Sequence, residues 1–206
     1  MRVVIPSAGM GTRLGMNKPK GLVEIKGRPL VAWQMDSIPP GMEVCVVVGY
    51  QADLMKTTIL KAKPDAMIVE NVDFRTTGVA KSVLMGCQKT EGNVIVLDGD
   101  ILSTKSLISQ FQSMETLVGI REKASWDRPV LVSINDGMVT RFSREEGDFE
   151  WACVACMSPS LLRDDDDFFY RGLERSLPAK TVLIEAPEID TIEDLKEAEK
   201  WASTNL

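Results

Sequence analysis

The 206-residue sequence contains no histidine. That absence excludes histidine-based hydrolytic triads, most zinc enzymes and acid–base catalysis by imidazole. No apolar run approaches the roughly 20 residues of a membrane span, and no secretory leader pattern follows Met1. The sequence therefore predicts a cytoplasmic protein without a membrane partner.

Basic residues are outnumbered by acidic ones, with 24 Lys and Arg against 30 Asp and Glu, which gives a net charge of −6. This balance argues against nucleic acid as a partner, because such proteins need a basic face. The positive charge is nevertheless concentrated between residues 12 and 29, where five cations accompany one acid, Glu24: Arg13, Lys18, Lys20, Lys26 and Arg28. A compact cationic segment in an acidic chain indicates a small anionic ligand.

The four cysteines predict neither a disulfide framework nor a zinc site. Cys153 and Cys156 have C-x-x-C spacing, but no second pair and no histidine accompany them. An odd spacing would direct the two thiols to opposite faces of a strand. We therefore expect reduced cysteines packed in the core.

The first two-thirds of the chain alternates β-branched runs with runs of helical period, which predicts βαβ units and a mainly parallel sheet. The expected strands are 2–6, 43–48, 66–70, 93–97 and 117–121, and the expected helices are 29–37, 51–62 and 79–88.

The pattern changes after residue 120. Asn135-Asp136-Gly137 predicts a tight hairpin between strands at 129–134 and 138–143. Strands at 151–157 and 181–186 and a helix over 191–202 complete the expectation, with Thr191-x-x-Asp194 as its capping box. The four aspartates 164–167 predict a solvated loop or a helix start. We expect one α/β domain, a Rossmann-like three-layer sandwich with a mainly parallel mixed sheet and a small antiparallel appendage.

A glycine-rich loop follows the first expected strand, over residues 7–15. Backbone amides in such loops approach phosphates closely. The dinucleotide pattern G-x-G-x-x-G fails, since Leu14 stands at its third glycine, and the Walker pattern is absent. Instead Arg13 lies in the loop and Lys20 shortly after it. Two cations beside backbone amides suit a triphosphate whose charge must be neutralised on both sides of the bond that breaks.

One long motif begins with Gly9-x-Gly11-Thr12-Arg13 and continues after five residues with Pro19-Lys20-x-Leu22-Val23-Glu24-Ile25-x-Gly27-Arg28-Pro29-Leu30. This motif resembles the signature of the sugar-phosphate nucleotidyltransferase superfamily. The similarity continues through residues 46–50, 97–100, 150–151 and 188–195, in the order of the superfamily. In length the chain is most similar to the choline-phosphate cytidylyltransferase-like members. The resemblance implies a GT-A-like nucleotidyltransferase fold, with a nucleotide-binding half over about 1–116 and an acceptor-binding half over about 117–206.

The same resemblance implies roles for individual residues. Thr12 and Arg13 would hold the departing phosphates, and Lys20 would contact the α-phosphate and the incoming phosphate. Asp100 and Asp190 would hold Mg²⁺, while Glu150 and Trp151 would bind the acceptor. The remaining residues would contact the nucleotide: Ala8, Gly9, Gly11, Thr77, Gly78, Ser82 and Asp98.

The residues allow some of these roles to be examined. Asp98 and Asp100 follow an apolar strand at its carboxyl end, where open α/β sheets bind ligands. Gly99 between them suggests a turn, so one carboxylate is expected to be structural, and Asp100 is favoured as the ligand. Asp190 could instead cap the last helix, although Thr191 is available for that purpose.

The acceptor is less defined. Its phosphate could be met by Lys123, Arg128 or Lys180, and five aromatic residues could form a cage for a quaternary ammonium, although such residues more often pack in cores: Trp126, Trp151, Phe168, Phe169 and Tyr170.

The sequence and the resemblance together predict an enzyme that uses Mg²⁺ to move a nucleotidyl group from a nucleoside triphosphate, with CTP favoured, to a phosphorylated sugar or alcohol. Members of the superfamily often form homodimers, although no interface pattern is visible here. Two alternatives stay open: a GT-A glycosyltransferase that uses a nucleotide-sugar, and a nucleotide-sensing domain without turnover. The leading hypothesis requires Arg13 and Lys20 to share one surface with Asp100 and Asp190.

Overall fold

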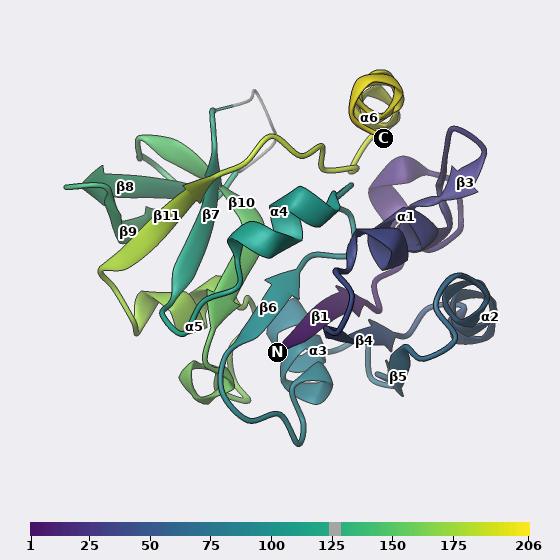
Figure 1. Ribbon diagram of the computed structural model, residues 1–206, viewed down its shortest axis with the longest axis horizontal. Helices are drawn as coiled ribbons and strands as arrows, with labels where there is room; N and C mark the ends of the chain where they lie inside the picture. The colour runs from purple at the N-terminus through teal and green to yellow at the C-terminus, as the bar shows by residue number, and fades with distance from the viewer. Residues whose placement is uncertain (124–128) are drawn as a thin grey trace.

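The computed structural model describes residues 1–123 and 129–206. Four parallel strands form one side of its nine-stranded sheet, in the order β5 (Met67–Glu70), β4 (Glu43–Val48), β1 (Arg2–Ser7) and β6 (Val94–Leu97) (Figure 1). The Val- and Ile-rich sequences of β1, β4 and β6 are buried on both faces, as parallel strands covered by helices require, whereas the edge strand β5 is only partly buried.

The second half of the chain extends the same sheet. β10 (Phe149–Met157) is antiparallel to both β6 and β7 (Leu117–Arg121). The order continues with β11 (Ala179–Leu183), β9 (Met138–Ser143) and β8 (Leu131–Asn135). Because β8 also pairs with β10, the strands β10, β7, β11, β9 and β8 close into a ring. The predicted antiparallel appendage is therefore continuous with the main sheet.

Helices cover both faces of the sheet. α1 (Leu30–Ser37), α2 (Ala52–Ala62) and α4 (Lys105–Gln110) contribute to one apolar core with β1, β4 and β6. α3 (Val79–Gly86) and α5 (Tyr170–Glu174) contribute to the core on the opposite face. These layers confirm the predicted α/β fold, although α4 and α5 were not expected because each is only five or six residues long.

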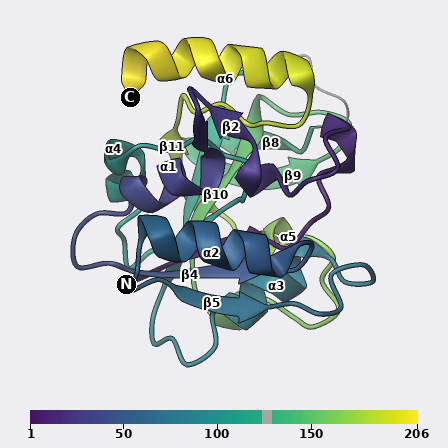
Figure 2. The same cartoon turned by 90° about the vertical axis from the view of Figure 1, so that its right-hand side faces the viewer.

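A third, smaller core lies beside the glycine loop. The loop contains the short 3₁₀ turn η1 (Thr12–Leu14). A second turn, η2 (Lys20–Leu22), and the ribbon β2 (Glu24–Ile25) and β3 (Arg28–Pro29) follow it. The long helix α6 (Ile192–Asn205) lies over this ribbon, as Figure 2 shows at the top of the molecule. The predicted capping box of Thr191 and Asp194 is present at the start of α6. Another 3₁₀ turn, η3 (Pro159–Leu161), follows β10.

The pairing of β10 contains an irregularity that the sequence did not predict. The pairing of β10 with β7 shifts between Trp151 and Ala155, and Cys153 within this irregularity has a φ of 57°. Cys45, Cys87 and Cys156 are buried and free, as expected, whereas Cys153 is free but only partly buried. No helix among the described residues is long and apolar enough to cross a membrane.

Candidate active site

A pocket of about 400 Å³ opens at the carboxyl ends of β1 and β6. Its wall combines the glycine loop, the start of α3, the irregular part of β10 and the segment before α6. Thr12 and Glu150 are the two predicted site residues that do not line it. Twelve others do: Ala8, Gly9, Gly11, Arg13, Lys20, Thr77, Gly78, Ser82, Asp98, Asp100, Trp151 and Asp190.

The glycine loop folds back at Gly11, whose φ is 62°. This conformation favours glycine because a side chain there would be strained. A Cβ on Gly11 would also lie 3.1 Å from both the carbonyl oxygen of Lys18 and Cγ of Lys20. Gly11 thus allows the loop to turn and the stem of Lys20 to pass closely beside it, while buried Leu14 anchors the turn in the third core.

Arg13 and Lys20 meet the two predicted metal ligands. Lys20 Nζ donates to Asp100 Oδ2 at 2.7 Å and also to Asp190 Oδ1. Arg13 Nη1 lies 2.8 Å from Asp190 Oδ2. The four residues therefore share one surface, as the leading hypothesis requires.

Backbone pairing explains how Asp100 and Asp190, which are 90 positions apart in the chain, come together. Asp100 follows β6 and Asp190 precedes α6, and a bridge joins Ile101 to Glu188. Ile189 N donates to the carbonyl oxygen of Asp100 at 3.0 Å. Asp190 does not cap α6 through its side chain, since Thr191 and Asp194 perform that function and Asp194 Oδ2 accepts from Asp190 N.

Glu188 is a site residue that sequence reasoning missed. One carboxylate oxygen from each of Asp100, Glu188 and Asp190 lies within 4.8 Å of the others, a grouping that could hold a metal ion. Asp100 Oδ1 is buried and has no hydrogen-bond partner among the described residues. Oxygen ligands of this kind suit Mg²⁺. The i, i+2 spacing of Glu188 and Asp190 in an extended segment was the signal that could have identified the third carboxylate.

The pKa values of the site residues reflect the close spacing of these acidic side chains. Burial tends to lower the pKa of Lys20, but Asp100 and Asp190 outweigh it, so this pKa lies above its usual value. Burial and then the charge of Asp100 raise the pKa of Glu188 to about 7, against the opposing effect of Arg121. Burial also raises the pKa of Asp98 well above its usual range, with Asp100 contributing next. The carboxylates therefore crowd one another and favour a bound cation.

The side chain of Glu150 is buried behind the pocket wall and does not line the pocket. Its side chain is only 1% exposed, and its Oε2 accepts from Arg121 Nε at 3.2 Å. Arg121 Nη2 in turn donates to Glu188 Oε2 at 2.6 Å. The observed contact of Glu150 is thus with Arg121, which orients Glu188, and its predicted acceptor contact stays a prediction.

The part of the pocket assigned to base and ribose is organised by Asn71. Its Nδ2 donates to Thr77 Oγ1 at 3.0 Å and to Ser82 Oγ at 3.1 Å. A Cβ on Gly78 would collide with the backbone of Asp167, so the aspartate-rich loop packs closely against the start of α3.

This aspartate-rich loop is less solvated than expected. Asp166 is 6% exposed and receives two hydrogen bonds of 2.6 Å from Arg175. The expectation of a simple solvated run is therefore wrong at Asp166, because an arginine from the end of α5 neutralises it.

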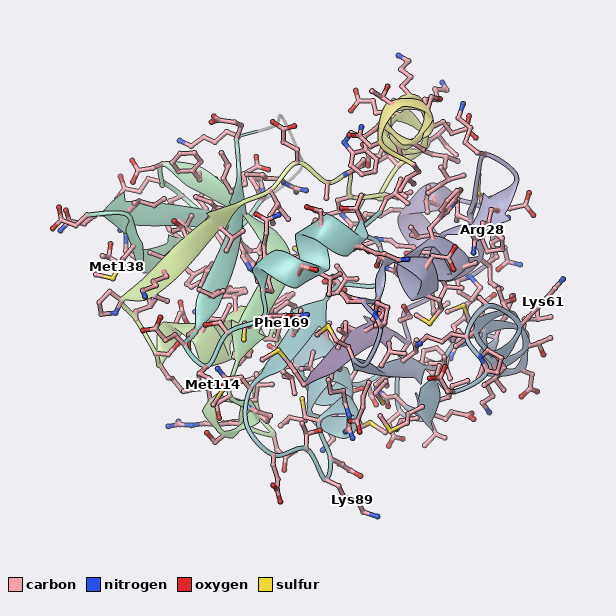
Figure 3. The ribbon with its side chains drawn as sticks, viewed as in Figure 1. Arg28, Lys61, Lys89, Met114, Met138 and Phe169 are labelled. Atoms are coloured by element: carbon pink, nitrogen blue, oxygen red, sulfur yellow. The ribbon has the colours of Figure 1, made fainter. Side chains whose placement is uncertain are left out.

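The aromatic residues pack mainly on one another. Phe169 is fully buried in the interior (Figure 3), and its ring centroid lies 4.6 Å from that of Trp151. Phe168 is 43% exposed, with the guanidinium of Arg144 5.5 Å from its ring centroid. These contacts are typical of core and edge packing and not of an open cage. Trp126 lies outside the described residues.

The candidate cations for the acceptor phosphate lie mostly elsewhere. Lys180 Nζ pairs with Glu115 Oε2 at 2.5 Å, and neither Lys180 nor Lys123 lines the pocket. Arg128 lies outside the described residues. Arg121 and Arg144 line the pocket instead.

Solved structures share this architecture over their whole length. The inositol-1-phosphate CTP transferase from T. maritima has a TM-score of 0.77 and 18% identity, covering 100% of this chain and 97% of that chain. The CTP:phosphocholine cytidylyltransferase from Streptococcus pneumoniae has a TM-score of 0.76 and 18% identity, covering 98% of each chain. At such identity the likeness establishes the fold alone. The fold is therefore one that solved nucleotidyltransferases share.

Sequence comparison identifies the family. Residues 1–126 match the model of IspD, 2-C-methyl-D-erythritol 4-phosphate cytidylyltransferase, and the chain belongs to this family. The bifunctional protein GlmU of Anaeromyxobacter dehalogenans is 30% identical over 129 residues, 60% of this chain and 25% of that protein. The chain spans about a quarter of the length of the curated relatives it matches. The resemblance to the nucleotidyltransferase superfamily is confirmed.

Proposed function

We propose that this protein transfers a nucleotidyl group from a nucleoside triphosphate, with CTP favoured, to a phosphorylated sugar or alcohol and releases pyrophosphate. The observation that carries the proposal is the meeting of Arg13 and Lys20 with Asp100 and Asp190 in one pocket. Cations for phosphates and carboxylates for a divalent ion then lie on the same surface, as phosphoryl-group transfer requires.

The chemistry explains why no histidine is needed. The second pKa of a phosphate monoester is about 6, so the acceptor is mostly dianionic at neutral pH and needs no general base. One of its oxygens forms a bond to the α-phosphorus. The bond from that phosphorus to the bridging oxygen of the β-phosphate breaks, and its electron pair leaves with pyrophosphate.

The chain's own residues would orient these anions. Lys20 would lie between the α-phosphate and the acceptor phosphate and reduce their repulsion, while Thr12 and Arg13 would hold the departing pyrophosphate. The backbone of Ala8, Gly9 and Gly11 would line the nucleotide.

Asp100, Asp190 and the newly found Glu188 would hold Mg²⁺, whose donor preference their oxygens match. When bound, the ion would neutralise negative charge on the phosphates during transfer. Asp98 lines the pocket and would bind the nucleotide, and the hydrogen bond that its Oδ1 accepts from Gly99 N at 2.8 Å would orient its carboxylate.

CTP is favoured because the matched family and the two structural relatives described above are named for cytidylyl or CTP transfer. We assign base and ribose contacts to Thr77, Gly78 and Ser82, and acceptor contacts to Trp151 with Glu150 supporting Arg121. Nucleotide binding would occupy residues 1–116 and acceptor binding residues 117–206. A homodimer remains part of the proposal by analogy with the superfamily.

Pyrophosphate release measured with each of four nucleoside triphosphates and a panel of phosphate monoesters tests the proposal. We expect release with CTP to exceed that with ATP, GTP and UTP for at least one acceptor, and an Asp100→Asn variant to abolish it. Release with no combination would contradict the proposal. In that case, cleavage of a nucleotide-sugar would favour the glycosyltransferase, and nucleotide binding without turnover would favour the sensor.

A further inference from the structure

Lys20 occupies an unusual place for a phosphate-binding lysine. Its ammonium group lies between two members of the Asp100, Glu188 and Asp190 group, and its side chain is only 17% exposed. The same atom therefore has two competing uses: it can neutralise carboxylates, or it can neutralise phosphates.

We propose that Lys20 is a built-in counter-ion of this carboxylate site, and that Lys20 and a divalent cation occupy the site in alternation. The protein without nucleotide then binds a divalent ion weakly, and the ion enters when nucleotide phosphates draw Lys20 away. This inference rests on the metal assignment of the proposed function and adds to it the order in which ligands are accepted.

The contacts place the two occupants in competition. Lys20 Nζ donates to Asp100 Oδ2 and Asp190 Oδ1, and the same residues supply two of the three grouped oxygens. A divalent ion at those oxygens would lie within a few ångströms of the ammonium group, where repulsion between cations in a partly buried site is large. Binding of either cation therefore disfavours binding of the other.

The surroundings keep Lys20 in this place. The close approach of the Lys20 stem to Gly11 fixes the direction from which the side chain enters. A lysine amine is charged at neutral pH. Arg13 also contacts Asp190, but its side chain is 61% exposed, so solvent screens its interaction more strongly. Lys20 is therefore the main competitor of the metal.

Calorimetric titration of MnCl₂ into the protein without nucleotide tests the inference. We compare the wild type with Lys20→Met and Lys20→Gln, the second of which keeps a polar side chain in case the first does not fold. If Lys20 occupies the site for more than about nine-tenths of the time, its removal raises the apparent Mn²⁺ affinity at least about tenfold. Lys18→Met is the matched control, because Lys18 lies two residues away and has no ion pair among the described residues.

Two further measurements exclude a trivial explanation. The Asp100→Asn change, added to Lys20→Met, should remove the gain, because it removes a carboxylate that the ion needs. Thermal unfolding should show that Mn²⁺ stabilises the two Lys20 variants more than the wild type. This second readout depends on neither nucleotide nor turnover.

Equal or weaker Mn²⁺ binding by both Lys20 variants would overturn the inference. So would a gain that survives Asp100→Asn or that appears equally in Lys18→Met, because the ion would then bind elsewhere. A gain confined to the Lys20 variants supports the inference even if the wild type releases no pyrophosphate with any substrate. That combination would reject the proposed function alone.

Discussion

Two glycines of the nucleotide loop allow backbone strain to be separated from the placement of Lys20. Gly11 and Gly15 have φ values of 62° and 65°, so alanine at either position is strained. Only at Gly11 would the new Cβ lie 3.1 Å from Lys20 Cγ, whereas nothing lies within 4 Å of a Cβ on Gly15. The variants Gly11→Ala and Gly15→Ala therefore share the backbone strain and differ in the close contacts of the new Cβ, which at Gly11 also include the carbonyl oxygen of Lys18 at 3.1 Å.

The expected stability losses are similar. Left-handed backbone costs a residue with a Cβ about 1–2 kcal/mol, and each kcal/mol lowers the melting temperature of a chain this long by about 2–4 °C. Both variants should melt roughly 2–8 °C below the wild type. Urea unfolding followed by tryptophan fluorescence provides the free energies.

The expected catalytic losses differ. A contact of 3.1 Å forces the Lys20 stem to move by a few tenths of an ångström. Since a displacement of 1 Å can cost about 100-fold in rate, Gly11→Ala should lower kcat/KM about three- to tenfold and Gly15→Ala less than twofold. The assay is pyrophosphate release at a temperature well below both melting transitions. Equal losses in the two variants would refute the reasoning, because strain alone would then account for them.

Three other changes test separate parts of the structure. Lys20→Ala should lower turnover by about 10²–10³-fold with an unchanged circular dichroism spectrum, and near-normal turnover would remove Lys20 from the mechanism. Asp190→Asn should raise the Mg²⁺ concentration for half-maximal activity at least about tenfold, and an unchanged metal titration would contradict its assignment. Asp166→Asn should cost about 1.5–3 kcal/mol at pH 7, because it weakens the charged hydrogen bonds from Arg175. Those bonds hold the pKa of Asp166 below its usual value, so urea unfolding should show this difference above pH 4 and lose it as the pH falls through the folded-state pKa. A difference that persists at pH 2 would contradict the last prediction.

Periodicity identified most of the fold because the elements carry strong local patterns. The strand 43–48 and the strand 138–143 have the predicted bounds, and the hairpin turn Asn135-Asp136-Gly137 left little choice of connection. The strand expected at 181–186 instead ends at residue 183, since partners on β7 and β9 determine where pairing stops. No local sequence pattern predicted the irregularity at Cys153.

The site was predictable where one contiguous motif carried it. Arg13 and Lys20 lie within a few residues of the glycine loop, so spacing was informative. Glu188 and its partner Arg121 are 67 residues apart, and their contact depends on how β7 and the segment after β11 are placed. Residue type alone could not indicate that the ammonium group of Lys20 would lie between Asp100 and Asp190, because this depends on the close passage beside Gly11.

β10 is antiparallel to β6 on one side and to β7 on the other, although it comes later in the chain than both. A fragment ending near residue 126, where the family match stops, would lack this strand and present the apolar residues Val94–Leu97 as an unprotected edge. The loops that line the pocket can therefore be exchanged without changing the order of the strands. Separation of the two halves of the chain would instead disrupt the middle of the sheet. Engineers who wish to graft a new acceptor specificity should replace loops around a retained β10 and not swap the carboxyl-terminal half as a module.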